Sequence, residues 1–260
     1  MDLNLQGKRV IVSGGSRGIG LAIVSRFLEE GAHVAFFARG VEGVDQALAQ
    51  LQKQIGSSES NIFGAAVDAA NHAAVHEWVE SAAQQMGGID IVINNTSASA
   101  SIEWNDEAWR NSFDVDLMAA VTMNESALPY LEKSSSAAIL QVATVTAFEH
   151  HHMSVCPSYG ALKAATVNYS AQLAQNWGEK GIRSNSVSPG PIYIEGGAWH
   201  GIKENYKDLY ERDRLAHPQQ RLGSAEEVAN VAVFVCSPAA SWVNGENVVV
   251  DGGFTNRVGF

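Results

Sequence analysis

Four glycines lie within seven positions near the start of the chain, at Gly14, Gly15, Gly18 and Gly20. They separate an apolar run from a segment with helical spacing, so they form a turn that leads into a helix N-terminus. Such a turn offers free backbone N–H groups and the positive end of the helix dipole to a pyrophosphate, which side chains would block. The stretch predicts a dinucleotide site, although glycines also serve turns and tight helix–strand packing.

Tyr159 and Lys163 are the second group that can do chemistry. Their spacing of four places both side chains on one face of a helix. A phenol, with a pKa of about 10, is a poor acid–base group at neutral pH until a neighbouring ammonium stabilises the phenolate. The pair therefore predicts a tyrosine whose pKa is lowered by Lys163. Taken alone, the pattern also fits a solvated helix face.

The elements that position these residues alternate along the chain. Runs rich in apolar and β-branched residues predict strands at 8–13, 33–38, 62–67, 89–93, 137–143, 182–188 and 246–250. Helical spacing follows the glycines as far as Gly31 and recurs at 42–55, 71–86, 106–132, 157–177 and 225–236. The alternation predicts an α/β fold: a single Rossmann-type domain over 1–260, with a doubly wound parallel sheet of about seven strands and helices on both faces. The least regular segment, 189–221, is expected to be a substrate-side lobe.

These motifs together resemble the classical short-chain dehydrogenase/reductase family, and in particular its 3-oxoacyl-carrier-protein reductase-like members. The glycine spacing Gly14-x-x-x-Gly18-x-Gly20 and the pair Tyr159-x-x-x-Lys163 carry the resemblance. Further matches span nearly the whole chain: Asn185-x-Val187-x-Pro189-Gly190, Arg221-Leu222-Gly223 before Glu226-Glu227-Val228-Ala229, Asn244-Gly245, and Val250-Asp251-Gly252-Gly253-Phe254. The resemblance implies hydride transfer between a nicotinamide dinucleotide and a carbonyl/alcohol substrate. Tyr159 would be the general acid–base, and Lys163 would lower its pKa and bind the cofactor ribose.

The choice of dinucleotide follows from charge at the end of the second predicted strand. That strand ends at Arg39 with no carboxylate, and Arg17 lies inside the glycine turn. An acidic residue there selects NAD, whereas arginine accommodates the extra phosphate of NADP, so we expect NADP(H) rather than NAD(H). Asp68 and Asn94 match family residues that follow the third and fourth strands, and each can instead be a polar cap at a strand end. The cofactor contacts expected from the resemblance are Ser13, Gly14, Ser16, Arg17, Gly18, Ile19, Gly20, Arg39, Asp68, Asn94, Tyr159, Lys163, Pro189, Gly190 and Ile192.

Two departures from the family pattern fall among the expected catalytic residues. The family's serine is replaced by Thr144 when the fifth strand is aligned, or by Thr146 when positions are counted back from Tyr159. We favour Thr144, whose hydroxyl can donate to a substrate carbonyl while its methyl group restricts the site. Asp116 stands in place of the family's relay asparagine, where a carboxylate adds charge near Lys163 and can accept the relay proton.

Two further departures lie beside the cofactor. Ser97 replaces a glycine, and Ile194 replaces a threonine that contacts the carboxamide in the family. The leading hypothesis is a ketone reductase. The alternative is a non-catalytic NADP(H)-binding sensor or interaction protein with an altered proton relay.

Charge and cysteine content limit the partners. The chain has 17 Lys and Arg against 28 Asp and Glu, a net charge of −11, which argues against nucleic acid and anionic membrane surfaces as partners. Two cysteines and an N-terminus unlike a signal peptide predict a cytoplasmic protein without disulfides. The resemblance implies a homodimer or homotetramer built through the helices near 106–132 and 157–177.

The segment 148–156 holds three consecutive histidines, from position 150 to position 152. Metal ligands need spacings that converge on one centre, and no acidic or cysteine partner recurs at such a spacing, so no metal is expected. The loop is instead expected to line the substrate mouth. The aromatic residues Trp104, Trp199, Tyr193 and Tyr206 fall in segments that flank the same pocket, although each taken singly fits the core or an interface equally well.

Overall fold

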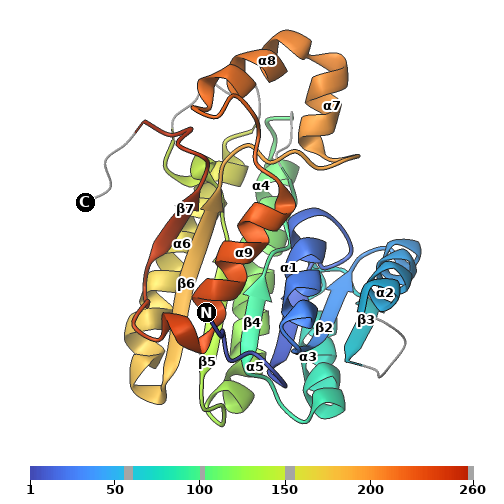
Figure 1. Ribbon diagram of the computed structural model, residues 1–260, viewed down its shortest axis with the longest axis vertical. Helices are drawn as coiled ribbons and strands as arrows, with labels where there is room; N and C mark the ends of the chain where they lie inside the picture. Colours follow the sequence, from blue (N-terminus) through green and yellow to red (C-terminus); the bar gives the residue numbers. More distant parts are fainter. Residues whose placement is uncertain (56–60, 100–102, 150–155, 257–260) are drawn as a thin grey trace.

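Within the residues that the computed structural model describes (1–55, 61–99, 103–149 and 156–256), seven parallel strands form one sheet in the order β3-β2-β1-β4-β5-β6-β7. Helices cover both faces of this sheet (Figure 1). This doubly wound α/β arrangement confirms the predicted fold class. The strands are β1 Arg9–Ser13, β2 His33–Ala38, β3 Ile62–Ala66, β4 Ile91–Asn94, β5 Ala137–Val142, β6 Ile182–Pro189 and β7 Asn247–Val250.

The two faces of the sheet carry separate apolar cores because side chains alternate along each strand. Val10 and Val12 of β1 pack with α1 (Gly18–Glu29), α2 (Val41–Ile55) and α9 (Ala225–Cys236). Ile11, between them, packs on the other face with α3 (His72–Met86), α5 (Ala119–Leu131) and α6 (Ser158–Trp177). The central strands are buried on both sides, which is why they read as continuous apolar runs.

Polar side chains fix where several helices begin. The Asn71 side chain accepts a hydrogen bond from the Ala74 N–H at the start of α3. Ser224 and Glu227 form a reciprocal capping box at the start of α9, each accepting from the backbone N–H of the other. These caps satisfy N–H groups that the first turn of a helix cannot pair internally.

The predicted helix at 106–132 is continuous but not uniform. It consists of α4 (Asp106–Ser112), a π-helical segment (Phe113–Met118) and α5, and Asp116 lies in the π-helical part. A π turn is rare and occurs frequently at functional sites. The sequence pattern predicted the length of this element but not the change of helix type.

The segment 189–221 contains two helices, α7 (Ala198–Asn205) and α8 (Lys207–Ala216). Figure 1 shows them together at one end of the molecule, beyond the ends of the strands that lead to them. Neither helix has a buried residue among those described. Without a core-facing stripe there was no apolar period to reveal them, which explains why the sequence appeared irregular here.

Cys156 and Cys236 are both free and buried. No helix in the described ranges combines the length and the apolar character that a membrane span requires. The cytoplasmic location and the absence of a nucleic-acid partner stay predictions.

Candidate active site

The carboxyl ends of the parallel strands meet at one edge of the sheet. This edge brings together the glycine turn after β1, Arg39 after β2, and Thr144 after β5. The lobe of α7 and α8 extends from the same edge, because β6 ends there and leads into α7 (Figure 1). Ligands of open α/β sheets bind at this edge, so the predicted cofactor and catalytic residues are gathered where a site is expected.

The glycines of this turn are required for two reasons, backbone conformation and close packing. Gly14 and Gly18 have positive φ angles of 69° and 56°, which side chains rarely adopt. A Cβ on Gly20 would lie 2.1 Å from the Gly14 carbonyl oxygen, and one on Gly15 would lie 2.5 Å from Cβ of Phe36. Close packing thus accounts for two of the glycines and backbone conformation for the other two.

The turn leaves the N-terminus of α1 free to bind an anion. Arg17 occupies the N-cap position, and its side chain makes no capping hydrogen bond. The first N–H groups of a helix have no internal partner and carry the positive end of its dipole. Ser16 faces the start of α2, where a Cβ on Gly43 would lie 3.7 Å from Ser16 Oγ, and Ile19 packs partly buried on the core. The cradle suits a phosphate group.

Arg17 and Arg39 are both exposed, and neither side chain has a hydrogen bond or ion pair within the described parts of the chain. They are available to an anion beside the glycine turn. Asp68 is also exposed, and its Oδ1 accepts from the Ala70 N–H at 3.1 Å. That contact makes Asp68 a polar cap after β3 and leaves its other carboxylate oxygen open.

Asn94 points into the protein. It is buried, and its Nδ2 donates to Oδ1 of Asn124 on α5 at 2.8 Å. The next residue, Asn95, holds the glycine turn: its Nδ2 donates to the carbonyl oxygens of Ser13 at 3.1 Å and Gly14 at 3.0 Å. Sequence reasoning missed this role of Asn95. The available signal was its place directly after a strand that neighbours β1.

Ser13 completes the connection between β1 and β4. Its Oγ accepts from the backbone N–H groups of Asn95 at 2.9 Å and Thr96 at 3.1 Å. Ser13 is buried, and its role is to stabilise the conformation of the glycine turn. The glycine turn is therefore fixed to the segment after β4.

Pro189, Gly190 and Ile192 form the connection from β6 to the lobe. A Cβ on Gly190 would lie 2.7 Å from Cβ of Asp251, so glycine is required for this close approach. Ile192 forms an isolated parallel bridge with Gly223, which closes the base of the lobe. The family motif Arg221-Leu222-Gly223 thus holds the two ends of the lobe together.

Lys163 is buried between the ends of β4 and β5. Its Nζ donates to the carbonyl oxygen of Val142 at 3.0 Å and to that of Thr96 at 3.3 Å. The same Nζ lies 3.3 Å from Oδ1 of Asp116, whose carboxylate is fully buried. The expected proximity of Asp116 to Lys163 is present.

The pKa of the Tyr159 hydroxyl differs from the expected one. Burial, and after it the negative charge of Asp116, raise the pKa of Tyr159 to about 12, against a smaller lowering by a hydrogen bond with Thr144. Lys163 was expected to lower the pKa of this phenol. In the structure its ammonium is engaged by two carbonyl groups and paired with Asp116, which offsets its charge.

Thr144 and Thr146 differ in position. Thr144 makes the hydrogen bond with Tyr159, and its Oγ1 accepts from the Thr146 N–H at 3.2 Å. The Thr144 Oγ1 also donates to Thr146 Oγ1 at 3.3 Å, and the Thr146 carbonyl oxygen lies against Gly160, where a Cβ would be 2.8 Å away. The geometry brings Thr144, rather than Thr146, to the tyrosine hydroxyl.

Only some of the residues expected around the substrate contact one another. Tyr193 OH contacts Nδ1 of His200 at 3.2 Å and donates to the Glu195 carboxylate at 3.1 Å on the lobe. Trp104 and Tyr206 are exposed, and Trp199 is partly exposed. The three histidines at 150–152 lie outside the described residues. No group of three metal-binding side chains occurs within the described ranges, and the expected absence of a metal stays a prediction.

Ile194 and Ser97 are the two departures from the family pattern that were expected beside the cofactor. Ile194 covers the start of α1, where a Cβ on Gly18 would lie 2.9 Å from Ile194 Cδ1. A groove of about 460 Å³ between α1 and α9 begins beside these two residues. Ser97 Oγ accepts from the Ser99 N–H at 2.9 Å and stabilises the turn after β4.

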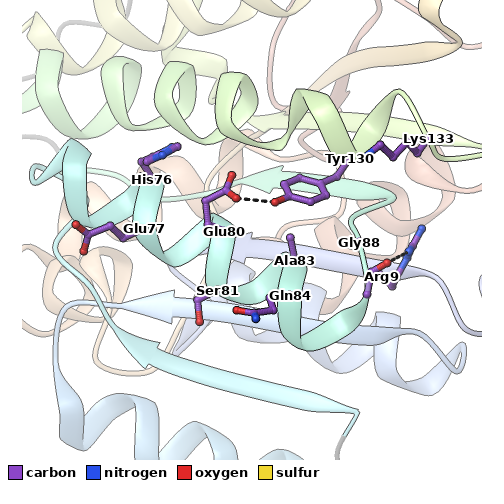
Figure 2. Close-up of a pocket in the computed structure, with 11 residues that line it drawn as sticks. Arg9, His76, Glu77, Glu80, Ser81, Ala83, Gln84, Gly88, Tyr130 and Lys133 are labelled. Atoms are coloured by element: carbon purple, nitrogen blue, oxygen red, sulfur yellow. Dashed lines mark hydrogen bonds between the residues drawn. The ribbon is translucent and has the colours of Figure 1, made fainter.

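A larger groove lies far from this chemistry. Figure 2 shows it between α3 and α5, where Tyr130 OH donates to Glu80 Oε2 at 2.6 Å. It has a volume of about 770 Å³ and is lined by Arg9, at the opposite end of β1 from the glycine turn. None of the predicted site residues lines it, so size alone does not identify the site.

Comparison with known proteins agrees with this geometry. The sequence model of the family described as "Enoyl-(Acyl carrier protein) reductase" matches residues 14–255. Isoepoxydon dehydrogenase patN of Penicillium expansum is 39% identical over 255 residues, covering 97% of this chain and 96% of that protein. D-threitol dehydrogenase of Mycolicibacterium smegmatis is 31% identical, covering 98% of this chain and 95% of that protein.

A solved structure is similar over the full length. L-sorbose reductase from Gluconobacter frateurii, complexed with NADPH and L-sorbose, superposes with a TM-score of 0.88 at 32% identity, covering 99% of this chain and 100% of that one. The matched family model, these relatives and the shared fold agree with the motif set found in the sequence. The chain belongs to the classical short-chain dehydrogenase/reductase family, whose members are oxidoreductases of alcohols and carbonyl compounds.

Proposed function

We propose that this protein is an NADP(H)-dependent carbonyl reductase. The observation that carries the proposal is the arrangement of Tyr159, Thr144 and Lys163 at the carboxyl edge of the sheet, beside the glycine turn. The raised pKa of Tyr159, about 12, leaves its hydroxyl protonated at neutral pH. A protonated phenol can donate a proton to a carbonyl oxygen, as carbonyl reduction requires.

The residues present fit the dinucleotide. The uncapped N-terminus of α1 would hold the pyrophosphate, and the exposed Arg17 and Arg39 would hold the additional phosphate of NADP. Lys163, on α6 with its Nζ beside the end of β5, would reach the ribose. The bound nicotinamide supplies or accepts the hydride.

The side chains of this protein supply the proton and orient the substrate. Tyr159 would donate its hydroxyl proton to the oxygen of the carbonyl group as that carbon becomes an alcohol carbon. Thr144 would donate a hydrogen bond to the same oxygen and hold it near the tyrosine. Ile194, beside the α1 N-terminus, would exclude water from that end of the site.

The relatives suggest the substrate class. By their names they act on isoepoxydon, D-threitol and L-sorbose. We propose an oxygenated ketone or its alcohol, with several polar groups, as the substrate of this protein.

Cofactor titration is the first test. We expect the reduced nicotinamide fluorescence to report tight binding of NADPH and weak binding of NADH. Replacing Arg39 or Arg17 with glutamine should weaken NADPH binding about tenfold each and leave NADH unchanged, because each removes a charge-assisted contact. Arg26→Gln, at the far end of α1, is the matched control. Equal binding of both dinucleotides would refute the NADP(H) preference.

Turnover tests the catalytic assignment. Tyr159→Phe should lower the rate of ketone reduction by about a hundredfold to ten-thousandfold, since it removes the proton donor, and leave NADPH binding unchanged. Tyr169→Phe, on the same helix, should retain activity. If Tyr159→Phe stays active the mechanism is wrong, and if the wild type binds NADPH but reduces no ketone, the sensor hypothesis takes its place.

A homo-oligomer is the proposed assembly. Trp109 and Phe113, four positions apart at the junction of α4 and the π-helical segment, are 43% and 47% exposed. Large apolar side chains exposed on one face favour an interface between copies. Light scattering after size exclusion should give a dimer or tetramer mass, and a monomer mass would contradict the assignment.

A further inference from the structure

Asp116 is an unusual carboxylate. Its side chain is fully buried in the π-helical segment, and neither oxygen accepts a hydrogen bond within the described residues. Among the residues that the structure describes, its charged contact is the Lys163 ammonium, with Nζ 3.3 Å from Oδ1. Burying a carboxylate costs free energy unless a neighbouring positive charge compensates it. Asp116 therefore acts mainly through the Lys163 ammonium beside it.

The Lys163 ammonium cannot act freely on Tyr159. It donates to the carbonyl groups of Val142 and Thr96 at the ends of two strands, and Asp116 approaches the same nitrogen. The positive charge of Lys163 and the negative charge of Asp116 therefore nearly cancel each other. Burial and, after it, the negative charge of Asp116 therefore raise the pKa of Tyr159.

We infer that Asp116 is a positioning residue that offsets the charge of Lys163 and keeps Tyr159 in its protonated, proton-donating form. The inference rests on the proposed function and adds a pH dependence to it: alcohol oxidation needs a phenolate to accept the proton, and Tyr159 forms that phenolate only under alkaline conditions. The raised pKa of Tyr159, to which the charge of Asp116 contributes after burial, supports the geometry.

The helices that pack on the π-helical segment carry further charged groups, and those of α4 and α5 are the exposed Asp106, Glu107, Arg110 and Glu125. Asp114 lies on the same segment and is partly exposed. His72, at the start of α3, places its Nε2 3.1 Å from the Asp114 carbonyl oxygen. From α6, Lys163 and Tyr159 face Asp116. Asp114 is therefore the suitable control, since it carries the same charge on the same turn without a contact to Lys163.

The first experiment needs neither cofactor nor substrate. The near-ultraviolet absorbance of tyrosinate is followed during alkaline titration, and the curve of the matching Tyr159→Phe protein is subtracted so that only Tyr159 remains. We expect Asp116→Asn to lower the midpoint by about one pH unit or more, because it removes a like charge from beside the phenolate. Asp114→Asn should leave the midpoint unchanged. Circular dichroism over the same range shows where each protein stays folded.

Coincident curves for the wild type and Asp116→Asn would overturn the inference. If Asp116→Asn does not fold, Asp116→Ser also removes the charge, and the same shift is expected from it. A shift of equal size in Asp114→Asn would show a general effect of net charge and would also overturn the inference.

The second experiment follows the rate of alcohol oxidation. One pH unit corresponds to a tenfold change in phenolate at fixed pH, so Asp116→Asn should raise the oxidation rate at neutral pH about tenfold. The rising limb of the oxidation rate should move to lower pH, with KM for the substrate nearly unchanged. A purely structural role would not move this limb. A shifted titration in a protein without turnover would refute the proposed function alone, whereas normal turnover with an unmoved limb would refute the role of Asp116 alone.

Discussion

Two threonines two positions apart illustrate how the structure decides between single residues. The sequence allowed either Thr144 or Thr146 to stand for the family's serine. The backbone turns after β5, and the N–H of Thr146 donates to the hydroxyl oxygen of Thr144. That turn directs Thr144 to Tyr159, and no rule of spacing contains this information.

Replacing Thr144 with valine should lower the rate of carbonyl reduction by about a hundredfold, because the donor to the reacting oxygen is lost while the shape is kept. Thr144→Ser restores the hydroxyl and should restore most of the rate. Thr146→Val is the matched control and should stay close to wild type. Steady-state rates of the three variants with one ketone check the expectation. A loss in Thr146→Val as large as that in Thr144→Val would reverse the assignment.

At the scale of elements, the parts that pack on both sides were predictable. Each of the seven strands was expected within a few residues of its observed bounds, because buried parallel strands consist of apolar and β-branched runs. Helices α7 and α8 were not predicted, since neither buries a face. The π-helical turn at Asp116 was also missed, because helical spacing in the sequence does not distinguish a short π-helical turn from an α-helix.

Hydrogen bonds join β1 to β4 at the edge opposite the site. Asp90, just before β4, accepts from the side chain of Arg9 at 2.8 and 2.9 Å and from Ser134 Oγ at 2.6 Å. Burial acts to raise the pKa of Asp90, but these donors outweigh it and lower the pKa to about 2. A carboxyl whose pKa is lowered by folding stabilises the folded state above its unfolded pKa, and loses that effect as pH falls towards the folded value.

Asp90→Asn should therefore lower the free energy of unfolding at neutral pH by roughly 2 kcal/mol, the value of a shift of this size. The difference from wild type should shrink as pH falls from about 4 towards 2. Urea unfolding at a series of pH values measures it. Asp45→Asn, on the exposed side of α2, should show little effect at any pH. A difference for Asp90→Asn that is independent of pH would contradict the ionic explanation.

At the scale of the whole molecule, the sheet with its two cores contrasts with the lobe. Both cores bury large side chains from several helices, whereas α7 and α8 bury none among the described residues. Segments with few buried contacts open at a smaller free-energy cost than the rest of a fold. The lobe is therefore the part of this molecule that we expect to open first.

Limited trypsin digestion should make its first cuts in the lobe, at Lys203, Lys207, Arg212 or Arg214. Bound NADPH should slow these cuts, because the lobe begins beside the predicted cofactor residues Gly190 and Ile192. The same digestion with NADH at equal concentration is the control, and mass spectrometry of the first fragments identifies the sites. A first cut at Arg26, within α1, would contradict this order of opening.

The two ends of the lobe meet at its base. The Tyr193 N–H donates to the Gly223 carbonyl at 2.9 Å, and the Gly223 N–H donates to the Pro191 carbonyl at 3.0 Å. A segment whose ends are joined in this way can be lengthened, shortened or exchanged without moving the strands that carry it. We therefore expect that a different lobe can be grafted onto an unchanged sheet, in the laboratory as in evolution.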